Sequence, residues 1–152
     1  VRPVTSADEA TPNPNSMAAL AFAKLYILTG KTEYRDLADK VLIALSADIP
    51  KNVFATASLL TAFDTRTNGR LAVVVAPSGS DPNPFLKVLS KAVDPALHCL
   101  VLESTDDLPE DHPAKGKNAL EDKPTVYLCR EGACSFPMTR RKELEEALTV
   151  IP

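Results

Sequence analysis

Two cysteines near the carboxyl end of the chain are the residues whose type and spacing most clearly permit chemistry. Cys129 and Cys134 are separated by four residues, with Glu131 and Gly132 at a predicted turn between two short strands. Residues that face each other across such a hairpin lie about 4.5–5.5 Å apart, which is within the reach of a disulfide. The pair therefore admits three interpretations: reduced, buried thiols, which we favour, a reversible disulfide, or part of a metal site.

The sequence around Cys129 and Cys134 lacks the features that are typical of a catalytic dithiol or of a metal centre. A catalytic dithiol normally has two intervening residues and a helix amino terminus that lowers the pKa of one thiol. A zinc site needs about four ligands, and the further candidates besides carboxylates are Cys99, His98 and His112. We therefore predict no metal site and no cofactor.

A turn before the first expected helix is the second candidate region. Asp8 and Glu9 precede that helix and could line a pocket. Asn15 or Ser16 is placed to cap the helix, because either side chain can accept a bond from an orphan backbone N–H. We take Asp8, Asn15 and Ser16 as a candidate pocket turn. Two carboxylates without the rest of a pocket do not define an acid/base pair, so we expect no complete catalytic site in this chain.

The residues around this turn, 1–68, form a predicted helical segment. Apolar residues spaced three and four apart predict helices over 17–28, 32–45 and 53–64, the second of them capped by Thr32. All three are rich in alanine and apolar on more than one face. Such surplus apolar surface indicates more neighbouring helices than the chain itself supplies.

Residues 69–152 have the pattern of a small α/β domain, so the fold class is mixed α/β. A continuous β-branched run at 71–76 is typical of a strand buried on both faces. A helix over 83–93, capped by Asn83, then leads to a second strand at 98–102. Such a β-α-β unit predicts two parallel strands with a right-handed crossover.

A long acidic connection, 103–124, separates that unit from the end of the domain. Loops of this length inside compact domains usually bind, dock or move, and we expect a partly ordered excursion with a short helical turn near Leu120. Strands at 125–129 and 134–136 then form a predicted β-hairpin. A final helix follows, with Thr139 as its cap.

The composition of the chain argues against nucleic-acid binding and a membrane span, and it favours a reducing compartment. Seventeen basic and twenty acidic residues leave a formal net charge of −3, which argues against a nucleic-acid surface. The basic run Arg140-Arg141-Lys142 lies at a predicted helix start, and no apolar stretch approaches the ~20 residues that span a bilayer. An odd number of cysteines favours a reducing compartment, and hence the cytoplasm. Because the chain begins with Val1 rather than Met, we expect it to be cut from a longer protein.

Three runs of residues carry a resemblance to a known family. They are Asp8-Glu9-Ala10-Thr11-Pro12-Asn13-Pro14-Asn15-Ser16, then Leu28-Thr29-Gly30-Lys31-Thr32-Glu33-Tyr34, and finally Lys123-Pro124-Thr125-Val126-Tyr127-Leu128-Cys129 with Cys134 and Pro137. In these runs the chain resembles the C-terminal part of the spermatogenesis-associated thioredoxin-domain proteins, the YyaL-like family. The resemblance extends over nearly the whole chain in order. It departs from the family where Asn13 and Pro14 stand in place of a Ser-Gly pair.

The resemblance implies an architecture and leaves the reaction open. In that family a thioredoxin-like domain precedes an α/α toroid similar to six-hairpin glycosidases and sugar epimerases, and a small α/β region follows. Residues 1–68 would then be the last helices of the toroid and 69–152 the α/β tail. We accordingly expect a structural and interaction region, not itself an enzyme, whose partner is the remainder of its parent chain and which self-associates when isolated. The alternatives are a thiol-redox domain that uses Cys129 and Cys134, or part of a carbohydrate-acting enzyme.

Overall fold

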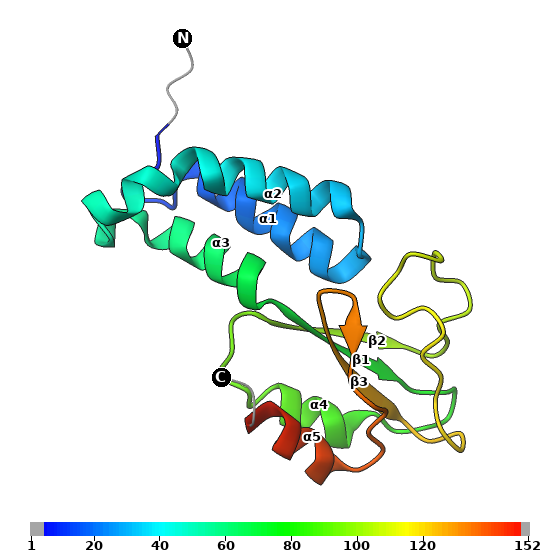
Figure 1. Ribbon diagram of the computed structural model, residues 1–152. Helices are drawn as coiled ribbons and strands as arrows, with labels where there is room; N and C mark the ends of the chain where they lie inside the picture. Colours follow the sequence, from blue (N-terminus) through cyan, green and yellow to red (C-terminus); the bar gives the residue numbers. More distant parts are fainter. Residues whose placement is uncertain (1–4, 150–152) are drawn as a thin grey trace. The chain divides into compact units, whose positions relative to one another are not determined.

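Figure 1 shows the computed structural model, which describes residues 5–149. The chain divides into two compact units, with the boundary between Gly69 and Arg70. We call them the helical unit and the sheet unit and describe each by itself. The predicted class is confirmed, since helices come first and a small mixed sheet with its own helices follows.

Three α-helices and two short 3-10 helices make up the described part of the helical unit. They are α1 (Pro14–Thr29), α2 (Thr32–Leu45), η1 (Ser46–Lys51), η2 (Phe54–Thr56) and α3 (Ala57–Asn68). Helix α1 packs against both α2 and α3 (Figure 1). Ala19 and Ala62 are fully buried in the core, and their small side chains let the helix backbones approach closely. Leu42, Leu45 and Leu59 complete this core, each contributing about 1.5–3 kcal/mol by its burial.

Several helix boundaries differ from the predicted ones by a few residues, and two of these differences have a local explanation. Helix α2 begins at Thr32 itself, so Lys31 occupies the cap position without a side-chain bond and the predicted Thr32 cap is wrong. The third helix begins at Ala57 rather than near 53, because the chain around Pro50 tightens into η1 and η2. Proline lacks the N–H that a regular α-helix needs, which accounts for this irregular stretch.

The sheet unit is built on four strands in the order β2-β1-β3-β4. Their bounds are β1 (Arg70–Val75), β2 (Leu97–Leu102), β3 (Thr125–Arg130) and β4 (Ala133–Cys134). The central strand β1 pairs in parallel with β2 and antiparallel with β3, and all six of its residues are buried. The predicted parallel β-α-β unit and the strand buried on both faces are therefore confirmed.

Two helices cover one face of this sheet, α4 (Asn83–Leu89) and α5 (Arg141–Thr149). The side chains in that layer are Ala72, Val74, Val126 and Leu128 from the strands and Phe85, Val88 and Leu144 from the helices. Helix α4 ends four residues before Val93, which is fully exposed, so the predicted extent over 83–93 is too long. Asn83 is the first helical residue rather than the cap, and its N–H donates to the Asp81 carboxylate at 3.0 Å.

The long connection 103–124 is an ordered series of turns. It contacts Tyr127 on the sheet face that α4 and α5 do not cover. Tyr127 lies between Val126 and Leu128 on β3, and those two side chains face the helices, so the Tyr127 side chain lies on the other face of the sheet. Its hydroxyl donates to the carbonyl of Asn118 at 2.6 Å. The Lys117 ammonium lies 5.7 Å from the centre of the same ring. The predicted helical turn near Leu120 is absent from the described chain; Leu120 instead forms an antiparallel bridge with Lys123. The acidic connection is thus part of the folded unit.

The hairpin between β3 and β4 is confirmed, although β4 is shorter than the predicted strand at 134–136. Its turn residues, Glu131 and Gly132, have φ values of 50° and 81°, the left-handed conformations that a two-residue hairpin turn requires.

At the start of α5 the side chain of Glu143 closes the helix end. Its carboxylate accepts the backbone N–H groups of Thr139 and Arg140, both at 3.1 Å. The helix begins at Arg141, so Thr139 lies outside the cap position that was predicted for it. The three residues of the basic run each pair with a glutamate of this segment: Arg140 with Glu143, Arg141 with Glu145 and Lys142 with Glu146.

Among residues 5–149, no helix combines the length and the apolar character needed to cross a membrane.

Candidate functional site

The segment before α1 is fastened to the amino terminus of α3 by Asp8. One carboxylate oxygen accepts the backbone N–H of Ser58 at 2.8 Å, and the other accepts the Ser58 hydroxyl and the N–H of Asn13. The Asp8 N–H in turn donates to the Ala55 carbonyl at 2.6 Å. Because Ser58 lies in the first turn of α3, Asp8 satisfies an orphan donor and places a negative charge at the positive end of the helix.

These bonds decide what Asp8 can do chemically. Burial opposes its ionisation, but the hydroxyl and amide of Ser58 and the amide of Asn13 outweigh that effect and lower the pKa of Asp8 below its ordinary value. A carboxylate held ionised by three donors is poorly suited to donate a proton. Asp8 is therefore an anchor for the pocket turn.

Asn13 is the buried centre of this turn. Its side-chain oxygen caps α1 by accepting the N–H groups of Asn15 at 2.9 Å and Ser16 at 3.3 Å. Its side-chain nitrogen donates to the Thr5 hydroxyl at 3.0 Å and to the Ala7 carbonyl at 3.1 Å. The prediction that Asn15 or Ser16 caps α1 is thus wrong. The sequence did contain the signal, since an asparagine directly before a proline is a favoured helix start.

Asn15 and Ser16, the other two predicted pocket residues, lie in the first turn of α1. The Asn15 amide donates to the Thr5 carbonyl at 3.0 Å. Ser16 is completely buried, and its hydroxyl has no hydrogen-bond partner within residues 5–149. Neither residue is among those that line the nearby pocket.

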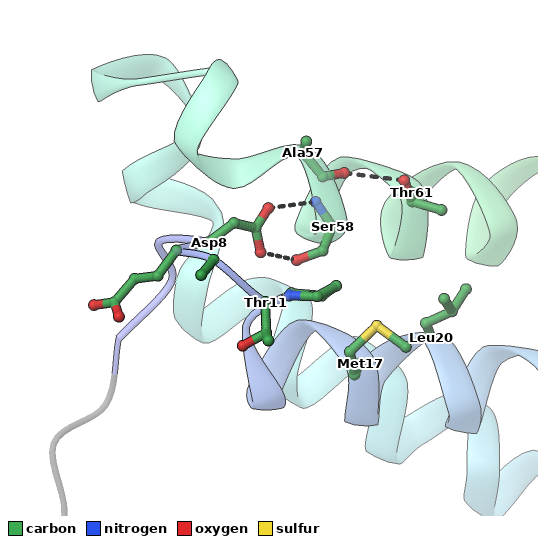
Figure 2. A pocket seen from close by; sticks show the side chains of 10 residues that line it. Asp8, Thr11, Met17, Leu20, Ala57, Ser58 and Thr61 are labelled. Carbon is green, nitrogen blue, oxygen red and sulfur yellow. Dashed lines mark hydrogen bonds between the residues drawn. The ribbon is translucent and has the colours of Figure 1, made fainter.

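That pocket has a volume of about 430 Å³ and lies between the turn, α1 and α3 (Figure 2). Its lining consists of Asp8, Glu9, Ala10, Thr11, Pro12, Met17, Leu20, Ala57, Ser58 and Thr61. In Figure 2 the Asp8 carboxylate points toward Ser58, with Met17 and Leu20 on the α1 side. The described lining contains no histidine, cysteine, lysine or arginine. An apolar pocket with a few hydroxyls and carboxylates can receive an apolar group.

The two cysteines singled out in the sequence form a disulfide. Cys129 and Cys134 face each other in register across β3 and β4 and are bonded to each other. The favoured interpretation as reduced thiols is therefore wrong in this structure, and the disulfide alternative agrees with it. Cys129 is buried, and the Cys134 sulfur lies 3.6 Å from the carbonyl oxygen of Pro113, in the long connection.

The remaining ligand candidates do not assemble into a metal centre. Cys99 and His98 lie in β2, whereas His112 lies in the long connection and accepts the Ala114 N–H through Nδ1 at 3.0 Å. Over residues 5–149 no three His, Cys, Asp or Glu side chains come together so that they could hold a metal ion.

Comparison with known proteins gives one distant similarity. No protein-family model matches the chain, and no solved structure matches it. The uncharacterized protein B0495.5 of Caenorhabditis elegans is 26% identical over 151 residues, which cover 96% of this chain and 20% of that protein. The chain thus spans about a fifth of the length of this relative.

Proposed function

We propose that this chain is the structural and interaction region at the C-terminal end of a larger YyaL-like thioredoxin-domain protein, where its helices complete an α/α toroid. The observation that carries the proposal is the amount of apolar surface that the helical unit leaves exposed. The exposed side chains are Met17, Leu25, Leu37, Ile43, Val53, Phe54 and Phe63. Phe54 is 94% and Ile43 74% exposed, although such side chains are normally buried or located at an interface.

Two further observations support a helical partner. The exposed apolar residues are distributed over α1, α2, α3 and the segment before α3, as expected for helices with neighbours on several sides. The C. elegans relative matches nearly all of this chain and is about five times as long. The remaining part of a protein of that size would supply the missing helices.

The proposal is tested on the chain as it stands. Its exposed helices should bind the dye ANS and cause concentration-dependent self-association in sedimentation velocity. A Phe54→Ser, Ile43→Ser double variant should lose most of both signals, whereas Val93→Ser, at a fully exposed position of the sheet unit, should change neither. A wild-type chain that stays monomeric at high concentration and binds no dye would contradict the proposal.

The disulfide favours a second candidate, a thiol-redox domain. In such a reaction a substrate dithiol would transfer two electrons and two protons to the Cys129–Cys134 disulfide, giving two protein thiols and a substrate disulfide. The burial of Cys129 slows attack at that sulfur and makes the half-buried Cys134 the point of entry. The test is the rate at which the protein oxidises a small dithiol. An identical rate for the wild type and for a Cys129→Ser, Cys134→Ser variant would dismiss this candidate.

A cytoplasmic location belongs to the same proposal. The free thiol of Cys99 fits a reducing compartment, whereas a lasting disulfide is uncommon there. Fractionation of cells that express the full-length parent, combined with alkylation of its free thiols before lysis, measures the compartment and the redox state together.

A further inference from the structure

The outer edge of the sheet unit is strand β2, and its backbone geometry leaves hydrogen-bonding groups open. The carbonyls of Ala96 and Leu102 accept N–H groups from the β1 side at 2.9 and 2.8 Å. Backbone groups alternate in direction along a strand, so even-numbered residues of β2 point toward β1. The N–H and C=O groups of Cys99 and Val101 consequently point away from the sheet.

This edge has none of the usual protection against an added strand. Cys99 is exposed and Val101 is 46% exposed. Strand β2 reads Leu-His-Cys-Leu-Val-Leu, without lysine, proline or glycine. Natural sheet edges are normally blunted by charges, prolines, bulges or very short strands. The six-residue edge of β2 is therefore available to an extended segment.

A groove of about 260 Å³ runs beside the same strand. Leu86 and Leu89 line it from α4, and Leu97 and Cys99 line it from β2. Leu97, Cys99 and Val101 alternate along β2, so their side chains share the face on which α4 lies. Alternate side chains of a strand added to β2 would point into this groove, the arrangement by which sheet edges recognise extended peptides.

The segment that contributes Leu86, Leu89, Ser90 and Ala92 to the groove also carries two basic residues. The segment from Asn83 to Val93 contains Lys87 and Lys91, both exposed, and no carboxylate. Asp94, at the end of the groove, is paired with Arg70 at 2.6 Å. The glutamates Glu143, Glu145 and Glu146 of the neighbouring α5 are paired within their own segment. Two lysines are thus left to attract an acidic partner.

We propose that the outer edge of β2, together with this groove, is a docking site for an extended acidic peptide segment that places one apolar side chain between α4 and β2. The backbone of the segment pairs with the open groups of Cys99 and Val101. Its carboxylates lie near Lys87 and Lys91. The residues of this site all belong to the sheet unit, whereas the apolar surface on which the proposed function depends belongs to the helical unit.

The probe is a synthetic peptide array. Each eight-residue member carries Leu, Val or Phe at its fourth position, threonine elsewhere, and two glutamates, two lysines or no charge at its ends. Fluorescence polarisation with the whole chain should rank the glutamate members first. N-methylation of two alternate peptide amides should weaken the best binder by at least about tenfold, equivalent to about 1.4 kcal/mol, because pairing requires those N–H groups. Binding should also slow alkylation of the Cys99 thiol by iodoacetamide.

Pairs of matched variants test whether the peptides bind at the outer edge of β2. Val101→Lys, a natural form of edge protection, should weaken binding by about tenfold or more, while Val93→Lys adds the same charge elsewhere and should not. A Lys87→Glu, Lys91→Glu variant should transfer preference from the glutamate to the lysine peptides. Circular dichroism verifies that each variant is folded. The proposal is overturned if no member binds, if N-methylation or Val101→Lys has no effect, or if Val101→Lys instead dissociates a dimer of a chain that ignores every peptide.

Discussion

Replacing Asp8 by alanine should destabilise the helical unit through a defined set of lost bonds. The carboxylate accepts the N–H of Asn13 at 2.7 Å, the N–H of Ser58 at 2.8 Å and the Ser58 hydroxyl. No other described group is bonded to it, and after the substitution two backbone donors, one of them in the first turn of α3, lose their partner.

The size of the effect follows from those three bonds. Loss of a helix-capping side chain costs about 0.5–2 kcal/mol, and hydrogen bonds to a charged group contribute about 1.5–3 kcal/mol each when buried. Asp8 is only half-buried, so water replaces part of the lost bonding. We therefore expect Asp8→Ala to lower the free energy of unfolding by about 2 kcal/mol. Asp8→Asn keeps an acceptor but loses the charge and should cost about half as much.

The sign of the pH dependence adds an independent check. The folded state lowers the pKa of Asp8 below its ordinary value of 3.8, so in the interval between the two values the unfolded chain binds more protons. Stability from Asp8 is therefore complete above about pH 4 and is lost as the pH falls through the lowered folded pKa. Asp8→Asn should remove this component of the acid-induced loss.

Urea unfolding followed by circular dichroism at 222 nm measures both effects. Glu9→Ala is the matched control, because Glu9 is exposed beside Asp8 and substitutions of that kind usually change stability by less than about 0.5 kcal/mol. Equal unfolding free energies for Asp8→Ala and Glu9→Ala, or an unchanged acid profile for Asp8→Asn, would refute the assignment of Asp8 as an anchor.

Three other substitutions test separate features. Gly69→Ala should lower the unfolding free energy by about 1–3 kcal/mol, because a Cβ there would overlap the carbonyl oxygen of Thr65; an unchanged urea midpoint would contradict this. Replacing Cys129 and Cys134 by serine, or reducing them with dithiothreitol, should cost about 2 kcal/mol for so short a closed loop. An intact mass after alkylation that shows three free thiols before reduction, instead of the Cys99 thiol alone, would argue against the bond. Tyr127→Phe should cost about 1 kcal/mol and speed trypsin cleavage within 103–124, which is measured by mass spectrometry; an unaltered cleavage rate would mean that the hydroxyl does not hold the loop.

The periodic parts of the fold could be predicted because their cause is local. The three- and four-residue spacing of apolar side chains gave α1 and α2, and the β-branched run gave the buried strand β1. The hairpin at Glu131 and Gly132 likewise has a local cause in its left-handed turn residues. In each case the pattern itself determines which face is buried.

The errors arose where distant residues decide the local structure. Asp8 and Ser58 lie 50 positions apart, and no periodicity reveals that a carboxylate in one segment closes a helix in another. Of the candidate turn residues, Asp8 lines the pocket, whereas Asn15 and Ser16 do not. Asn13, which organises the turn, has no periodic signal in the sequence. The acidic connection was judged by its length and charge, although contacts such as that of Tyr127 with Asn118 are what order it.

The two edge strands of the sheet, β2 and β4, limit how this protein can associate through added strands. At one border, β4 offers two residues and is tied covalently to its neighbour through Cys134, so it is too short to act as a template. At the other border, β2 offers a full strand. Because each copy of this protein has only one full-strand edge, two copies joined through that edge would have no second one left to recruit a third. The asymmetry thus favours one-to-one complexes and opposes the open-ended stacking that leads to fibrils.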